Sequence, residues 1–221
     1  MSIKKNDFVE LAFTATLTEN GEIVDTTEAE LHHDGHVHHG RGGPLTVCVG
    51  QGQLPKGVEN GLVGKALGPH TFALKADDAF GQKNPKLISM IPTNKFGEHH
   101  IKPVPGLQIN MDGRIGTVKT VSSGRTVVDF NHPLAGKELT YSVKILKLLT
   151  DPEEKLRALL LKVFDLKNTT LAKTTTGFVI KTKPAMPADA TKILAEKITE
   201  LTGITSVTFE EEVLNKPVNK N

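Results

Sequence analysis

The chain has 221 residues, of which 38% are hydrophobic and 24% are charged, and its formal net charge is +2. This balance is typical of a folded protein of one or two domains and excludes a disordered chain. Lysine and arginine are scattered rather than gathered into the basic stripe of a nucleic-acid surface, and no apolar run approaches the ~20 residues that cross a bilayer. We therefore expect neither a nucleic-acid partner nor a membrane partner.

The start of the chain and its cysteine content indicate a cytoplasmic protein. The opening segment, "MSIKKNDFVE", lacks the apolar core of a signal peptide. The single cysteine, Cys48, cannot form an internal disulfide, which suits a reducing compartment. Because Cys48 lies in the apolar run "PLTVCVG", we expect a small buried side chain rather than a catalytic thiol.

The N-terminal part of the chain is predicted to form short strands joined by turns. Apolar residues alternate along the first strand at Val9, Leu11, Phe13, Ala15 and Leu17. Asn20-Gly21 predicts a hairpin turn into a second strand over residues 22–27. "PLTVCV" is expected to be a third strand, residues 54–63 a short helix, and "HTFALKA" a further strand.

The segment Leu31–Gly43, "LHHDGHVHHGRGG", concentrates histidine between two of these strands. Five of the nine histidines lie here: His32, His33, His36, His38 and His39. Asp34-Gly35 and the closing glycines predict a loop. Neutral imidazoles bind Ni²⁺, Cu²⁺ and Zn²⁺, so the loop is a possible nickel or zinc site. A solvated loop that is merely rich in histidine is the competing interpretation.

Residues 85–130 differ in composition from the segments on either side of them. They carry several prolines and two hairpin signals, Asp112-Gly113 and Ser122-Ser123-Gly124, which predict a small β-rich unit. A long alternating strand, "ELTYSVKILKLL", follows this unit. A host strand that resumes after a self-contained segment indicates an insertion into the first domain.

Residues 151–221 are predicted to form a small α+β domain. Asp151 and Pro152 suit the N-cap and the first position of a helix. A strand "GFVIKTK", a helix that ends at Gly203 and a strand "SVTFEEEV" follow, giving the order helix, strand, helix, strand. Association and client binding are the two roles that this domain could serve, and we expect association as a homodimer.

Several motifs together resemble a known family. "LAFTAT", "NGEIVD", "PLTVCVGQGQLPKGVENGLVG", "DDAFGQ" and "FNHPLAGKELTYSVKILKL" occur in this order. Their order and the glycine spacing in "VGQGQLPKGVENGLVG" resemble the FKBP-type peptidyl-prolyl cis-trans isomerases, and among them the SlyD-like branch. The resemblance spans residues 5–149 and places the insertion where that family carries its insert-in-flap chaperone domain.

The resemblance implies an α+β fold with three parts. An FKBP-like twisted antiparallel sheet around a short helix is expected from residues 1–84 and 131–150, as the isomerase domain. Residues 85–130 are expected to form the small β-rich insert-in-flap chaperone domain. Residues 151–221 are expected to be the extra C-terminal α+β domain of the longer members.

The resemblance also implies a shallow apolar catalytic cleft. Its expected walls are Phe13, Val24, Asp25, Leu45, Val47, Leu54, Pro55, Val58, Phe80 and Tyr141. Rotation about an X-Pro bond meets a barrier of about 20 kcal/mol, and the planar amide is more charge-separated than the twisted one. A dry apolar pocket therefore favours the twisted state and requires no cofactor. We further expect a free backbone N–H near Leu54-Pro55 to hold the substrate carbonyl.

The insertion carries more apolar residues than a unit of its size can bury. The residues expected to bind unfolded client chains are Met90, Ile91, Phe96, Ile101, Leu107, Ile109 and Met111. The implied function is a prolyl isomerase and folding chaperone, with X-Pro peptides and unfolded or partly folded proteins as partners. The alternative is a non-catalytic metal-binding protein or holdase on an FKBP scaffold.

Overall fold

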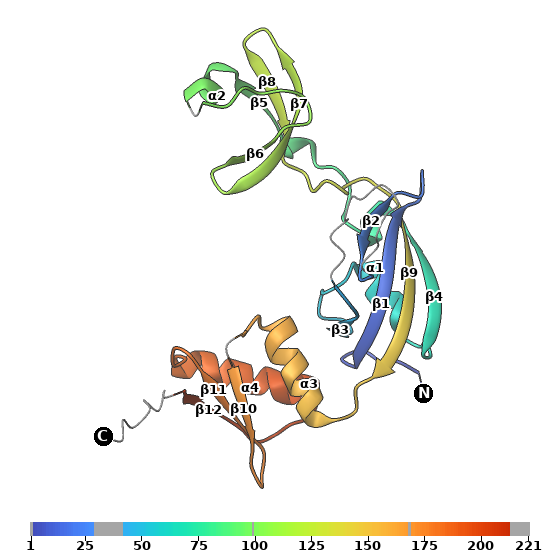
Figure 1. The fold of residues 1–221 in the computed structure, drawn as a ribbon, viewed down its shortest axis with the longest axis vertical. Coiled ribbons are helices and arrows are strands. Elements are labelled where there is room, and N and C mark those ends of the chain that lie inside the picture. The colour runs from blue at the N-terminus through green and yellow to red at the C-terminus, as the bar shows by residue number, and fades with distance from the viewer. Residues whose placement is uncertain (1, 29–41, 99, 168, 213–221) are drawn as a thin grey trace, which may run out of the picture. The chain divides into compact units, whose positions relative to one another are not determined.

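The structure, a computed structural model, describes residues 2–28, 42–98, 100–167 and 169–212. Its strands form three sheets (Figure 1), and its contacts divide the chain into two compact units. Unit 1 comprises residues 1–16, 21–72 and 140–221, and unit 2 comprises residues 17–20 and 73–139. The described part of the chain contains no helix that is long and apolar enough to cross a membrane.

The first sheet has five strands in the order β2-β1-β9-β4, with β3 also paired to β1. The strands span β1 (Phe8–Leu17), β2 (Ile23–Thr26), β3 (Leu45–Cys48), β4 (Gly68–Leu74) and β9 (Leu139–Leu148). The alternation predicted for β1 is confirmed, because its apolar residues from Val9 to Leu17 are buried at every second position. In β9, Tyr141, Val143 and Ile145 are buried in the same alternating way.

A short helix, α1 (Lys56–Leu62), packs against this sheet. The contact is close at Gly61, where a Cβ atom would lie 2.7 Å from the ring of Phe72 in β4. Val58 and Leu62 are completely buried. The predicted arrangement of an antiparallel sheet with one short helix is therefore confirmed.

The insertion forms its own antiparallel sheet in the order β5-β8-β7-β6, with a short helix α2 (Asn94–Glu98). The strands are β5 (Ile88–Pro92), β6 (Gln108–Met111), β7 (Arg114–Ser122) and β8 (Arg125–Asp129). The predicted Asp112-Gly113 turn joins β6 to β7, with positive φ angles of 51° and 78°. Phe96, Ile109, Val118 and Val128 form the core of the sheet.

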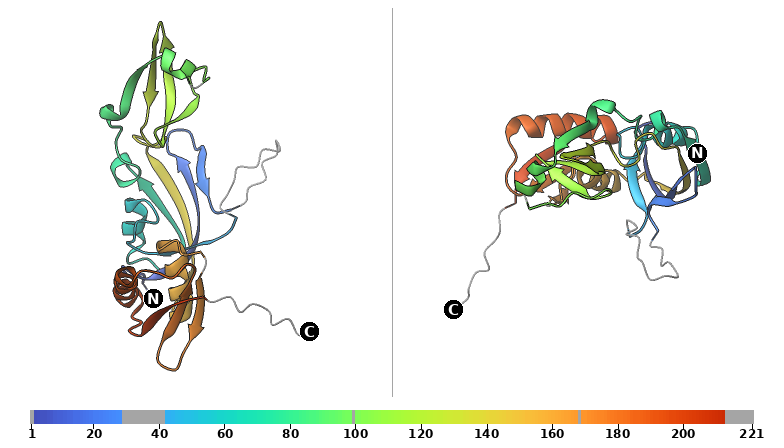
Figure 2. Two further views of the ribbon diagram at one scale, coloured as in Figure 1. Left: turned by 90° about the vertical axis from the view of Figure 1, so that its left-hand side faces the viewer. Right: turned by 90° about the horizontal axis from the view of Figure 1, so that it is seen from above.

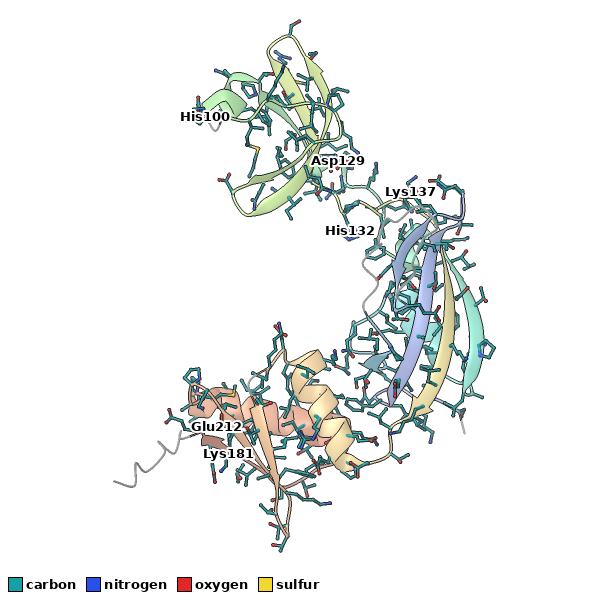
Figure 3. The ribbon with its side chains drawn as sticks, in the orientation of Figure 1. His100, Asp129, His132, Lys137, Lys181 and Glu212 are labelled. Atoms are coloured by element: carbon teal, nitrogen blue, oxygen red, sulfur yellow. The ribbon has the colours of Figure 1, made fainter. Side chains whose placement is uncertain are left out.

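Polar side chains join the two connecting segments at the base of this inserted sheet. Asp129 accepts hydrogen bonds from the backbone N–H and the side-chain amide of Asn131 at 2.9 and 2.8 Å. Asn131 in turn exchanges two hydrogen bonds with the backbone of Asn84, at 2.8 and 3.1 Å. Figure 3 shows Asp129 at this base, with His132 a little further along the chain.

The third sheet lies in the C-terminal region, in the order β10-β11-β12. It comprises β10 (Thr169–Lys173), β11 (Phe178–Thr182) and β12 (Val207–Glu211), together with helices α3 (Pro152–Ala158) and α4 (Ala188–Thr202). The caps are as predicted: Asp151 accepts a hydrogen bond from the N–H of Glu154 at 2.8 Å, and Gly203 ends α4 with φ 77°. Strand β10 was not predicted, so the order is helix, strand, strand, helix, strand.

The C-terminal region shares a core with the five-stranded sheet. Leu156, Leu159 and Leu160 pack in one cluster with Ile180 and Ile198 of the C-terminal sheet and helix. Phe8 of β1, Cys48 of β3 and Leu149, the residue after β9, are members of the same cluster. This common core explains why residues 140–221 fall in the same unit as the sheet. Figure 2 shows α3 and α4 beside the C-terminal sheet.

Candidate active site

Most of the predicted cleft residues in unit 1 lie on one face of the five-stranded sheet. Leu45 pairs with Leu11, Val47 with Val9, and Asp25 with Ala15. Directly paired residues of antiparallel strands share a face, so Asp25, Leu45 and Val47 lie on the face that carries the buried residues of β1.

Two aromatic rings lie together on this face. The rings of Phe13 and Tyr141 have their centroids 5.5 Å apart and are tilted by 34°. The backbone of Phe13 is held by Thr27, whose hydroxyl accepts the N–H of Phe13 at 2.8 Å and whose own N–H bonds the Phe13 carbonyl at 2.9 Å. Thr27 is buried, so these bonds fix the end of β2 and the position of the Phe13 ring.

The loop before α1 is held by one buried carboxylate. Glu59 is 6% exposed and accepts the backbone N–H groups of Gly52, Gln53 and Leu54 at 3.0, 2.8 and 3.2 Å. Neither Leu54 nor Pro55 offers a free N–H, because Glu59 engages the N–H of Leu54 and proline has none, so the expected N–H contact at the start of α1 stays a prediction. The loop still presents Leu54 and Pro55 in one defined conformation.

Val24 and Phe80 differ in setting from the other predicted wall residues. The pairing of β1 with β2 runs from Ala15–Asp25 to Thr16–Ile23, so Val24 is the extra residue of a β-bulge and is half-buried. Phe80 belongs to unit 2, where its ring stacks on His132 at 4.3 Å with 3° between the planes. The cleft roles of both residues stay predictions.

The thiol of Cys48 is buried and has low reactivity. Burial, together with the negative charges of Glu59 and Asp7, raises the pKa of this thiol to about 12. A thiol with such a pKa is protonated at neutral pH and is a poor nucleophile. The expectation of a small buried side chain is confirmed, since Cys48 is 1% exposed.

Four of the seven predicted client-binding residues line one pocket of about 190 Å³ in the inserted unit: Phe96, Ile101, Ile109 and Met111. Phe96 and Ile109 also belong to the core of the inserted sheet. Ile91 and Leu107 are half-buried against the same core, whereas Met90 is 61% exposed on the outer side of β5. Client binding itself stays a prediction.

The predicted metal ligands lie outside the described residues. His32, His33, His36, His38 and His39 fall in residues 29–41, and their part in metal binding stays a prediction. Among the residues that the structure does describe, no three histidine, cysteine, aspartate or glutamate side chains are grouped so as to hold a metal ion.

Sequence reasoning missed the residues that hold the site in place. Glu59, Thr27 and Gln53 do so through hydrogen bonds to backbone groups, and the Phe80–His132 stack was not expected either. The one available signal was an acidic residue soon after a glycine-rich loop, a pattern in which a carboxylate can reach back to free N–H groups.

Comparison with known proteins places the chain in a family. Residues 1–103 match the family model described as FKBP-type peptidyl-prolyl cis-trans isomerase, and residues 89–134 match the model described as the IF domain of FKBP26. The chain belongs to the FKBP-type peptidyl-prolyl cis-trans isomerase family and is an enzyme of that type. Its fold, an FKBP sheet with an inserted domain, agrees with this assignment, and the SlyD-like long form is supported.

Three relatives illustrate the similarity. A probable FKBP-type 16 kDa peptidyl-prolyl cis-trans isomerase of Pseudomonas fluorescens is 35% identical over 65% of this chain and 90% of the relative. A short-type peptidyl-prolyl cis-trans isomerase of Methanocaldococcus jannaschii is 29% identical over 65% of this chain and 92% of the relative. The SlyD isomerase of Pasteurella multocida is 33% identical over 66% of this chain and 68% of the relative.

Proposed function

We propose that this isomerase acts on unfolded or partly folded polypeptides, which its inserted unit captures and its five-stranded sheet isomerises. The single observation that carries the capture step is the amount of exposed apolar surface on the inserted sheet. Ile115 is 67% exposed, Met90 61% and Ile88 44%. An apolar surface of this kind, beside an adaptable methionine, suits binding of varied apolar segments.

The apolar residues form part of one sheet face. Met90 of β5 pairs with Val127 of β8. Ile88 lies two residues before Met90 on β5, so Ile88, Met90 and Val127 share one face of the sheet. The core residue Val128 lies on the opposite face, because neighbouring residues of a strand alternate. The face that carries Met90 is therefore available to a client chain, and the pocket beside Phe96 offers a second apolar contact.

The proposed catalytic surface is the sheet face that carries Phe13, Asp25, Leu45 and Tyr141. The buried rings and aliphatic side chains provide a weakly polar environment, in which a charge-separated planar amide loses solvation. The twisted amide loses less, so the barrier of about 20 kcal/mol falls. This chemistry needs no nucleophile and no metal.

Two substrates test the capture step. We expect a variant that lacks residues 85–130, closed by a short turn, to keep most of its activity on a short X-Pro peptide. Its catalysis of the proline-limited refolding of an unfolded protein should fall steeply. Equal loss on both substrates would mean that the insertion is only structural.

A point variant makes the test sharper. Met90→Glu places a charge on the exposed face, whereas Ser123→Glu places the same charge in the turn between β7 and β8. We expect Met90→Glu to slow catalysed refolding and Ser123→Glu to leave it unchanged. Two variants that behave alike would contradict the assignment of this face.

The non-catalytic alternative is disfavoured by the family assignment. The reducing compartment inferred from the single, buried Cys48 supports a cytoplasmic site of action.

A homodimer through residues 151–221 also stays a prediction. Its candidate edge strand, β12, carries Glu210 and Glu211, and such charges discourage unspecific strand pairing.

A further inference from the structure

A hollow of about 540 Å³ lies in unit 1 between the loop that follows β3 and the segment that follows α3. One side is formed by the isomerase part of the chain and the other by the C-terminal region. Its lining residues are Leu45, the loop Gln51–Gln53, Leu161–Val163, Asp165 and Lys167. A volume of this size is typical of a ligand site.

Both walls of this hollow are held in place. The side chain of Gln53 accepts the N–H of Cys48 at 2.6 Å and donates to the carbonyl of Lys162 at 3.0 Å, so it joins the two walls. Glu59 fixes the loop from within, through the N–H groups of Gly52 and Gln53. The shared core of Phe8, Cys48 and Leu159 lies in the same part of the unit. The hollow is thus a pre-formed feature.

The alternation of β3 connects the hollow with the predicted cleft. Leu45 lines the hollow and shares a face with Val47 and Leu11, the face proposed as the catalytic surface. Its neighbour Thr46 points to the opposite face and lines a different hollow of about 320 Å³. Leu161 and Lys162 line both hollows, but of the two β3 residues only Leu45, in the larger hollow, lies on the face proposed as the catalytic surface.

The lining suits a polypeptide segment with an acidic side chain. Leu161 is 43% exposed and offers an apolar contact, while the glutamines and loop backbone offer polar groups. Asp165 pairs with Lys167 at 3.3 Å, so the lining keeps one net positive charge, formally that of Lys162. The established substrates of the family are peptides or proteins, whose chain extends beyond the prolyl bond.

We propose that this hollow, between Leu45 and the Leu161–Lys167 segment, is a subsite for the stretch of substrate polypeptide beside the prolyl bond, with a preference for an acidic residue there. The proposal rests on the proposed catalytic face, and it gives the C-terminal region a direct part in substrate selection. Lys162 and Leu161 are the specificity-determining residues.

The test compares X-Pro peptides of different length, with turnover followed by NMR exchange so that no coupling protease is needed. A short peptide is compared with peptides extended, on one side or the other, by about four residues, roughly 13 Å of chain, bearing either Glu or Lys. For the extension that enters the hollow, we expect kcat/KM to be about two- to five-fold higher with Glu than with Lys, as for an exposed charge pair.

Two variants and one control make the result decisive. Lys162→Glu should reverse the preference, and Leu161→Asn should raise KM for the extended peptide without changing kcat. Lys192→Glu makes the same charge change on an exposed residue of α4 and should leave the preference intact. If neither extension shows a preference for Glu over Lys, or if Lys162→Glu does not alter that preference, the proposed subsite is contradicted. A wild-type protein inactive on the short peptide would instead refute the catalytic face itself.

Discussion

Asp25 is the only acidic residue among the predicted cleft residues, and it is half-buried on the same face as Phe13. A carboxylate there can respond to the changing charge of the twisting amide or order a neighbouring side chain. We expect Asp25→Ala to lower kcat/KM for a short X-Pro peptide at least about tenfold, which corresponds to ~1.4 kcal/mol of transition-state stabilisation. The circular dichroism spectrum should be unchanged.

Asp77→Ala is the matched control, because Asp77 is an exposed aspartate of unit 2 that is not part of the predicted cleft. Its activity should equal that of the wild type. Phe80→Ala tests the remaining aromatic wall in the same assay, with a similar loss expected. Full activity in both Asp25→Ala and Phe80→Ala would contradict the predicted cleft.

Asp129 couples the stability of the inserted unit to pH. Burial alone would raise the pKa of this carboxyl, but the hydrogen bonds from Asn131 and the charges of Lys83 and Lys119 outweigh it and lower the pKa. A lowered pKa stabilises the folded state above the ordinary aspartate value of about 3.9, and this stability is lost as pH falls through the folded-state pKa. The inserted unit should therefore weaken in acid.

We expect Asp129→Asn to lower the free energy of unfolding by about 1–3 kcal/mol at neutral pH, as for a buried charged hydrogen-bond acceptor. The difference from the wild type should shrink as pH falls toward about 3. Urea unfolding at both pH values measures it. Asp112→Asn is the control, since Asp112 is exposed and asparagine tolerates its positive φ of 51°. A pH-independent difference would mean that the charge of Asp129 is not the cause.

At the scale of elements, local signals were sufficient for most of the chain. The Asp151 cap, the Gly203 helix end and the Asp112-Gly113 turn are confirmed because each depends on a few neighbouring residues. Strand β10 was missed because "TTLAK" shows no clear alternation, and it becomes a strand through its pairing with β11. Figure 3 shows Lys181, in β11, and Glu212, just after β12, near each other on this sheet.

The histidine segment between β2 and β3 carries the metal prediction. We expect Leu31–Gly43 to bind Ni²⁺ or Zn²⁺ and binding to inhibit isomerisation, because strands that carry predicted cleft residues flank the segment. Affinity should fall below pH of about 6.5, where imidazole becomes protonated. Activity is titrated with Ni²⁺ beside a variant in which all five histidines are serine. Equal inhibition of both proteins, or binding without inhibition, would leave the solvated loop as the better interpretation.

At the scale of the whole molecule, the C-terminal region completes a core that begins in β1 and β3. Phe8 and Cys48 are each 1% exposed and cluster with Leu156 and Leu160. We expect a chain that ends at Thr150 to be less stable by at least about 1.5–3 kcal/mol, the value of one large buried side chain. Its midpoint of thermal unfolding should therefore fall.

The single cysteine provides a second measurement of the same change. In the full chain the raised pKa and burial of Cys48 should make it slow to react with a thiol reagent. In the shortened chain the reaction should be much faster under native conditions, and Cys48→Ser should abolish it. Similar stability and similar reactivity in both chains would show that the isomerase part forms a complete core without the C-terminal region.

The sequence by itself determined the family, most strands of the five-stranded sheet, the presence of the insertion, and the helix signals at Asp151 and Gly203. These features depend on motifs and on the alternation of nearby residues, which local physical chemistry dictates. Only the tertiary structure decided that Glu59 holds the loop before α1 and that Val24 lies in a bulge. It also decided that Phe8 shares a core with Leu156, and that Leu45 and Lys162 line one hollow. The last two contacts join residues more than a hundred positions apart, as does the hydrogen bond from Gln53 to Lys162, and they depend on packed surfaces that no local pattern encodes.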